Sequence, residues 1–196
     1  MLTLSLGLAA CGSSDDNDAA ASESTPSMSE SPAAMGAADG TFGPGCELVP
    51  TEGAGSFDGM MSDPVATAAS NNPLLTTLVA AVTEAELVET LNTAEALTVF
   101  APTDDAFAEI PEADLQALLA DKDALTKVLT HHVVAGQLSP DQIAGEHETL
   151  AGTMITVDGS GEEFSVQNAG GASNVVCGNV STANATVYVV DSVLMP

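Results

Sequence analysis

Basic residues are almost absent from this sequence, whose 196 residues include two lysines and no arginine, against 28 aspartates and glutamates. The formal net charge of -26 leaves almost nothing to neutralise phosphate groups, which excludes a nucleic-acid-binding protein. The same shortage argues against direct adhesion to anionic lipid headgroups. The acidic excess repels further copies of the chain, so we expect a monomer. Two interpretations of the excess stay open: attraction of cationic polymers or divalent ions, and a general adaptation to salt.

A long apolar run is also missing from the N-terminus. The first residues, "MLTLSLGLAAC", form a segment far shorter than the ~20 residues that span a membrane. The segment ends in small residues, as a secretory signal does, and Leu8-Ala9-Ala10-Cys11 resembles the bacterial lipobox, in which the cysteine carries the lipid. We expect residues 1–10 to be a lipoprotein signal peptide and Cys11 to be the lipid anchor. No basic residue precedes Leu2, so we expect the true start to lie upstream. The alternative is an apolar N-terminus with a chance cysteine.

Residues 11–40 are predicted to form a disordered tether. After Cys11 they consist mainly of Ser, Ala, Asp and Glu, without an aromatic or basic residue, and such a segment cannot bury enough apolar surface to fold. As a random coil its mean reach is about 30 Å. A tether directly after a lipidated cysteine is what a surface-displayed domain requires.

The cysteines are few, and none is in a CxxC pair. If Cys11 carries lipid, an even pair remains, Cys46 and Cys177. In an exported protein we expect this pair to form a disulfide. The disulfide would close a loop of about 130 residues and stabilise the fold by about 4–5 kcal/mol in the chain-entropy description. Metal binding by the two cysteines is not expected, because no histidine stands in ligand spacing with them.

The remaining sequence is helical first and strand-rich later, which predicts one α+β domain over residues 41–196. Residues 41–62 have the composition of an extended arm. Two helices are expected over 63–82, with Asp63 as the cap of the first, and further helical patterns follow in 84–95 and 111–131. A strand is expected at 97–101. From about residue 147 the apolar period is two, with a hairpin signal at "DGSG".

The stretch "LTVFAPTDDAF", residues 97–107, contains the strongest candidates for chemistry, the adjacent carboxylates Asp104 and Asp105. Thr103 is suited to cap a helix, and both carboxylates then fall in its first turn, where they interact favourably with the helix dipole. A catalytic or metal-binding pair is the alternative. It is disfavoured because neighbouring helical side chains point about 100° apart, and because no Ser/His/Asp order, third ligand or Gly-rich phosphate loop accompanies them. We therefore interpret all three residues as structural caps.

Three motifs resemble those of the fasciclin domain family, in the family's order and spacing. They are "LTVFAPTDDAFAEIP", "VLTHHVVAGQLSPDQI" and the closing "NATVYVVDSVLMP". The resemblance covers about residues 58–196 and is greatest to the secreted and lipid-anchored fasciclin antigens of mycobacteria and related actinobacteria. It implies a wedge of two β-sheets with a layer of helices, and pairing of Cys46 with Cys177. His132 matches the family histidine, which mostly packs and forms hydrogen bonds, whereas His131 stands where the family usually has Tyr.

The resemblance implies a non-catalytic surface protein without a cofactor or metal, which binds an extracellular protein or polysaccharide and contacts the membrane through its lipid anchor only. We expect it on the outer face of the cytoplasmic membrane or in the cell envelope, and also shed. The alternative function is an envelope small-molecule binder or sensor that uses a groove between helices and sheets. A deep apolar pocket with convergent polar groups would favour this alternative, and a flat acidic surface would favour adhesion.

Overall fold

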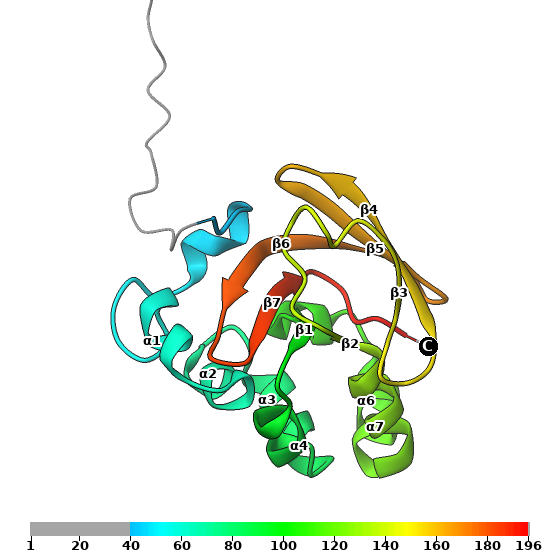
Figure 1. The fold of residues 1–196 in the computed structure, drawn as a ribbon. Coiled ribbons are helices and arrows are strands. Elements are labelled where there is room, and N and C mark those ends of the chain that lie inside the picture. Colours follow the sequence, from blue (N-terminus) through cyan, green and yellow to red (C-terminus); the bar gives the residue numbers. More distant parts are fainter. Residues whose placement is uncertain (1–39, 196) are drawn as a thin grey trace, which may run out of the picture. The chain divides into compact units, whose positions relative to one another are not determined.

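A seven-stranded mixed sheet lies at the centre of the domain in the computed structural model, which describes residues 40–195 (Figure 1). Its strands are β1 (Leu97–Pro102), β2 (Val133–Ala135), β3 (Gly145–Glu148), β4 (Met154–Ser160), β5 (Glu163–Asn168), β6 (Gly171–Ser181) and β7 (Ala185–Val190). Their order across the sheet is β2-β1-β7-β6-β5-β4-β3. Neighbouring strands are antiparallel except for β1 and β7, which are parallel. A bridge between Val134 and Thr149 joins the two edges, so the sheet is nearly closed.

Strand β6 bends and thereby creates the two walls of the expected wedge. Its first part, up to Asn174, pairs with β5, and its part from Val175 onward pairs with β7. The register shifts twice between Val175 and Val180. Such β-bulges bend a strand and increase its twist. The two sheets of the wedge are therefore two halves of one continuous sheet that share β6.

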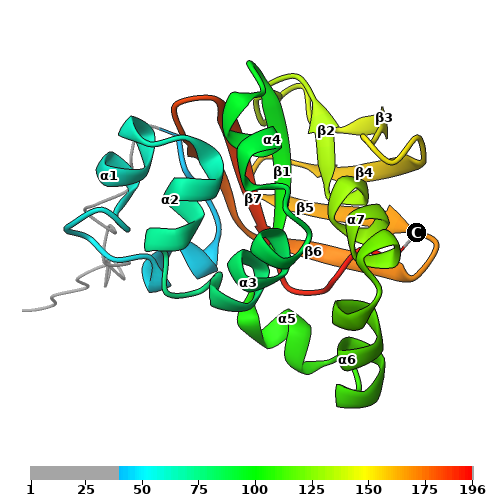
Figure 2. The ribbon, with the colours of Figure 1, turned by 90° about the horizontal axis from the view of Figure 1, so that it is seen from below.

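The helices gather on one side of this sheet, opposite the β4–β5 hairpin (Figures 1 and 2). They are α1 (Phe57–Ser62), α2 (Val65–Asn71), α3 (Thr76–Glu84), α4 (Val88–Thr93), α5 (Asp104–Ala108), α6 (Glu112–Ala120) and α7 (Lys122–His131). The 3-10 helix η1 (Pro44–Leu48) lies apart from them, against β6. This is the α+β arrangement that the sequence predicts. No helix within residues 40–195 is long and apolar enough to cross a membrane.

Two expectations for the N-terminal part of the domain are wrong. The arm at 41–62 is not wholly extended, because it contains η1 and α1. Asp63 does not cap α2, which starts at Val65. Two distant side-chain amides cap this helix instead: the Asn184 Oδ1 accepts from the Val65 N–H at 2.9 Å, and the Asn92 Oδ1 accepts from the Ala66 N–H at 3.0 Å. Tertiary contacts therefore replace the local cap that the sequence offers.

Strands β1 and β7 separate two apolar cores and supply side chains to both. Alternate residues of a strand point to opposite faces. On β1, Leu97 and Val99 face the core beneath the helices, whereas Phe100 faces the core enclosed by β4, β5 and β6. On β7, Val187 lies in the first core and Tyr188 in the second. Both strands are consequently buried along their whole length.

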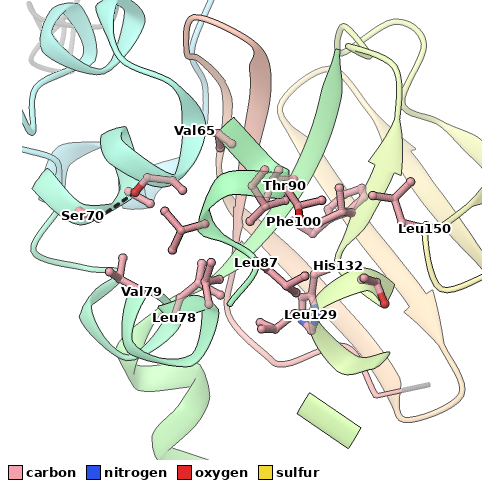
Figure 3. A pocket seen from close by; sticks show the side chains of 18 residues that line it. Val65, Ser70, Leu78, Val79, Leu87, Thr90, Phe100, Leu129, His132 and Leu150 are labelled. Carbon is pink, nitrogen blue, oxygen red and sulfur yellow. Dashed lines mark hydrogen bonds between the residues drawn. The ribbon is translucent and has the colours of Figure 1, made fainter. Parts of the chain in front are cut away.

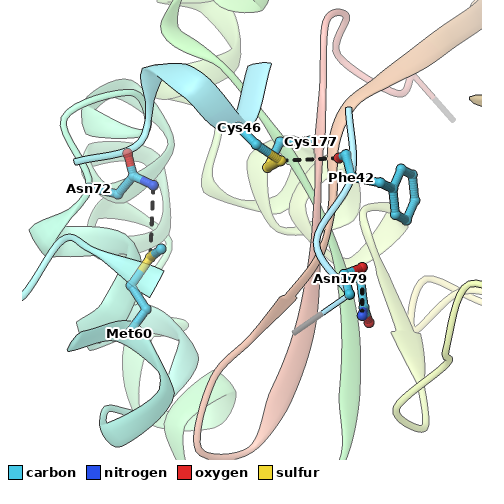
Figure 4. Close-up of a disulfide and its surroundings, with 7 residues drawn as sticks. Phe42, Cys46, Met60, Asn72, Cys177 and Asn179 are labelled. Carbon is cyan, nitrogen blue, oxygen red and sulfur yellow. Dashed lines mark hydrogen bonds between the residues drawn. A yellow bond between two sulfur atoms is a disulfide. The ribbon is translucent and has the colours of Figure 1, made fainter. Parts of the chain in front are cut away.

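The N-terminal arm is fastened to the bulged part of β6 (Figure 4). Phe42 and Gly178 exchange two backbone hydrogen bonds, of 3.3 and 2.8 Å. The Phe42 ring covers the Gly178 backbone so closely that a Cβ there would lie 2.2 Å from the ring Cζ. Cys46 and Cys177 form the disulfide that the cysteine count predicts, across 131 residues of sequence. The arm thus closes the second core, where the Phe42 ring packs against Phe164.

Loss of the disulfide should destabilise the domain without changing its fold. Replacing both Cys46 and Cys177 by alanine should lower the free energy of unfolding by about 2–5 kcal/mol, as for other long-loop disulfides. Urea denaturation of the full chain measures this change, and Cys11→Ser is the matched control that should leave stability unaltered. A digest of the unreduced protein should contain the linked peptide pair. Two thiols that alkylate fully without reductant would contradict the assignment.

Candidate functional site

An apolar cleft lies beneath α4, between α2 and α3 on one side and α7 and β2 on the other (Figure 3). Its volume is about 60 Å³. We call it the α4 cleft. Aliphatic and aromatic side chains make up most of its lining: Val65, Ala66, Ala69, Leu78, Val79, Val82, Leu87, Val88, Leu91, Val99, Phe100, Leu129, Val133 and Leu150. The cleft is therefore built mainly for contact with an apolar group.

A sharp turn between α3 and α4 places Leu87 in the cleft. Glu86 has the left-handed backbone angle φ 60°, which is uncommon for a residue other than glycine. The Glu86 N–H donates to the Thr83 carbonyl, and the Leu87 N–H donates to the Val82 carbonyl. These two bonds define a Schellman motif, which ends a helix and directs the next apolar residue back toward it.

The far end of α4 is held by one asparagine. The Asn184 Nδ2 donates to the carbonyls of Leu91 and Ala94, each at 2.8 Å. No residue of α4 itself is fully buried. The helix is thus fixed by its two ends and covers the cleft with half-buried side chains.

The polar side chains in the lining are mostly engaged already. The Ser70 hydroxyl donates to the Ala66 carbonyl, and the Thr130 hydroxyl donates to the Thr126 carbonyl. Both ring nitrogens of His132 have partners as well. These groups do not converge on the space of the cleft, so little is available to orient a polar ligand.

The volume of the cleft limits the size of the group that can enter it. A water molecule needs about 10–15 Å³ measured in this way, so about 60 Å³ has room for only a few waters. Sites for drug-sized ligands are about 300–1,000 Å³. The cleft suits one apolar side chain, or the end of a hydrocarbon chain.

The turn at residues 103–105 joins two helices. The Thr103 hydroxyl accepts from the Ala106 N–H at 3.2 Å, so it caps α5. The Asp104 carboxylate accepts from the Thr76 hydroxyl at 2.6 Å and from the Thr77 N–H at 2.7 Å, at the start of α3. Asp105 is exposed. The two carboxylates therefore differ in role, and only Asp104 links elements distant in sequence.

The environment of Asp104 also affects its ionisation. Burial alone would raise the pKa of this carboxyl, but the hydrogen bonds from Thr76 and Thr77 outweigh it and hold the pKa below its ordinary value. The stabilisation by the ionised group is present above the ordinary pKa and is lost as the pH falls through the lower folded-state pKa. Sequence reasoning missed this link because its partners lie 27 and 28 residues away. The only local sign is that Leu75, at the cap position of α3, provides no side-chain cap.

The histidines point to separate partners. The His132 Nδ1 donates to the Val128 carbonyl at 2.7 Å, and its Nε2 accepts from the Leu194 N–H at 2.9 Å. These two bonds require a neutral ring and attach the closing segment to α7. The His131 Nδ1 contacts the Thr153 hydroxyl, while its buried Nε2 lacks a hydrogen-bond partner. The His147 Nε2 lies 2.8 Å from the Ile143 carbonyl. Within residues 40–195, no group of three or more His, Cys, Asp or Glu side chains is placed to hold a metal ion.

The remaining site prediction, the lipid anchor Cys11, lies outside the described residues, as do the signal peptide at 1–10 and all but the last residue of the tether. The cleft itself was not located from the sequence. Its lining comes from separate helices and strands, and each lining residue has the ordinary spacing of a core position.

The two carboxylates should respond differently to substitution. Asp104→Ala should lower the free energy of unfolding by about 2 kcal/mol, because hydrogen bonds to a charged group are lost at the start of α3. Asp105→Ala should change it by less than about 0.5 kcal/mol, as for other exposed positions. Urea denaturation with and without calcium measures both. A calcium-dependent rise in the free energy of unfolding that disappears in Asp104→Asn would instead identify an ion site.

Acid should weaken the domain through His132. Burial lowers the pKa of this ring to about 4, against 6.5 ordinarily; the hydrogen bond to the Val128 carbonyl opposes this shift and the neighbouring His131 adds to it. The unfolded chain therefore takes up the proton first, and stability should fall as the pH drops from 6.5 toward 4. The loss should reach about 2 kcal/mol at pH 5. Urea denaturation at pH 7 and pH 5 measures it, and the difference should shrink by this amount in His132→Gln. An equal difference in both proteins would exclude His132 as the cause.

Comparison with known proteins places this geometry in a family. The family model of the fasciclin domain matches residues 73–196. The chain is 50% identical over 169 residues to the immunogenic protein MPB70 of Mycobacterium bovis, covering 82% of this chain and 84% of that protein. It is 52% identical over 149 residues to the cell surface glycolipoprotein MPB83 of the same species, covering 74% of this chain and 66% of that protein.

A solved structure shows the same fold. It is the FAS1 domain pair of the insect cell adhesion molecule fasciclin I, with a TM-score of 0.52 and 19% identity over 62% of this chain and 45% of that one. The sheet, the helical layer and the three sequence motifs agree with these matches. The chain belongs to the fasciclin domain family.

Proposed function

We propose that the protein is a cell-surface lipoprotein that displays one fasciclin domain and binds an extracellular protein or polysaccharide without catalysis. The observation that carries the proposal is the 52% identity to a protein named as a cell surface glycolipoprotein. The disulfide between Cys46 and Cys177 supports it, because disulfides persist mainly in oxidising compartments outside the cytosol. The order Leu8-Ala9-Ala10-Cys11 supplies the means of anchoring.

A non-catalytic role is supported by the hydrogen bonds that already occupy the side chains most capable of acid–base chemistry. Asp104 is bound to the start of α3, and the two nitrogens of His132 are bound to backbone groups. A general base must reach a substrate proton, and a nucleophile must reach its base. Neither arrangement occurs in the lining of the α4 cleft.

The second candidate function is that of an envelope small-molecule binder or sensor. The α4 cleft is the observation that favours it, since ligand sites are concave and mostly apolar. The small volume and the engaged polar groups favour protein contact over a polar small molecule. Isothermal titration with short apolar compounds separates the two candidates, because a small-molecule site should bind one of them without a protein partner.

We place the protein on the outer face of the cytoplasmic membrane or in the cell envelope, lipid-anchored through Cys11, with some of it shed. The net charge of -26 favours a monomer, because like-charged copies repel. The acidic surface also favours contact with the membrane through the anchor alone.

Anchoring and binding can be tested in one experiment. The full chain, with a complete signal, should partition into the detergent phase, and cells that express it should retain envelope or matrix proteins from an extract. Cys11→Ser should move the protein into the aqueous phase and release it from cells into the medium. The bound envelope or matrix proteins should then leave the cells together with it. Detergent-phase partitioning and mass spectrometry of the retained material are the measurements. Partitioning of the unaltered protein into the aqueous phase would contradict the anchor, and retention equal to that of cells without the protein would contradict the binding role.

A further inference from the structure

We propose that the α4 cleft is a docking pocket for one aliphatic or aromatic side chain of a basic protein segment. This inference deepens the binding role proposed above and rests on it. It assigns the binding face and the chemistry of the partner.

The shape of the cleft selects a single apolar side chain. Contact with such a side chain removes apolar surface from water on both partners. At about 60 Å³ the space accommodates one side chain and excludes a folded element. Leu150, 47% exposed, borders the cleft and extends the apolar surface beyond it. Binding energy in protein interfaces is concentrated at such anchor pockets.

Helix α4 can move slightly to make room for an entering side chain. It has no fully buried residue, and the side chains of Leu87 and Val88 are only partly buried where they pack on the core. Segments with few buried apolar contacts open locally at low free energy. The Schellman turn and Asn184 hold the two ends of the helix and would stay in place. The cleft can therefore widen without loss of the anchoring bonds.

The negative charges around the cleft favour basic residues on either side of the partner's apolar side chain. The segment that ends α3 and forms α4 carries four exposed glutamates within twelve residues: Glu84, Glu86, Glu89 and Glu95. Residues 87, 88, 90 and 91 of this segment line the cleft, which places Glu89 within one residue of its lining. Such charges act over a Debye length of about 8 Å at physiological salt. An anchor side chain flanked by Lys or Arg thus meets a complementary surface.

The two lysines of the chain do not reverse this preference. Both lie on α7, and Lys122 is 3.2 Å from the Glu86 carboxylate. The segment from 84 to 95 stays negative after that pairing, and the whole chain carries -26. The same charge disfavours a second copy of this chain and an anionic lipid surface as the occupant.

The probe is a synthetic peptide with one central leucine between two pairs of lysines, compared with the same peptide carrying a central alanine. Backbone amide shifts of the full chain, followed by NMR during titration, should move in α4, the α3–α4 turn and the end of α7. The leucine peptide should bind about tenfold more tightly than the alanine peptide, as burial of a leucine side chain implies.

Matched variants separate the contribution of the cleft to peptide binding from that of the overall negative charge. Ala69→Leu, which fills the cleft, should abolish the preference for leucine, whereas Ala80→Leu, on the exposed side of α3, should preserve it. Glu84→Gln with Glu89→Gln should weaken binding about threefold. Glu162→Gln with Glu163→Gln, the same change in charge at the tip of the β4–β5 hairpin, should have less than half that effect.

Three results would overturn the proposal. They are equal affinities for the leucine and alanine peptides, shifts confined to other surfaces, and equal effects of the two glutamine pairs. If dodecyl maltoside below its micelle concentration fills the cleft and the leucine peptide does not, the site takes a hydrocarbon chain instead. Because partners retained through another face would still show binding in the cell experiment, failure here leaves the proposed function standing.

Discussion

The parallel pairing of β1 with β7 is the contact on which the other parts of the fold depend. Every residue of both strands is buried, so each face of the pair needs a cover. Strand pairs buried on both faces are typical of sheets that lie between two layers. The helices supply one cover, and the bent half of the sheet together with Phe42 supplies the other. The bulges of β6 are needed because a flat strand would leave the second face open.

Polar side chains from distant parts of the sequence fix the helical layer over this pair. Asp104 begins α3, Asn184 and Asn92 begin α2, and His132 binds the closing segment to α7. The bonds from Asp104, Asn184 and Asn92 satisfy backbone N–H groups that the start of a helix would otherwise leave unpaired. The layer is held mainly at the helix ends, and the α4 cleft lies where short helices meet without filling the space between them.

Local chemistry predicted much of this fold. The strand at 97–101, which extends to Pro102, and the cap at Thr103 follow from patterns a few residues long. The hairpin at "DGSG" is also found, but its turn is displaced: residues 158–160 belong to β4, and Gly161 and Glu162 form the turn. The pairing of Cys46 with Cys177 follows from the cysteine count in an exported chain. The caps of α2 and α3 could not be predicted, because Asn184 and Asp104 come close to those helices only after the chain has folded. A cleft is equally hidden, since Leu87 or Leu129 has the same spacing whether it fills a core or borders a space.

The central position of β7 affects when the domain can form during synthesis. This strand lies between β1 and β6, yet it comes last in sequence among the strands of residues 40–195. An emerging chain that lacks β7 has neither the parallel partner of β1 nor the complete barrier between the two cores. Non-local pairings of this kind form late and slowly. The two cores can therefore close only after β7 has been made and has paired with β1 and β6.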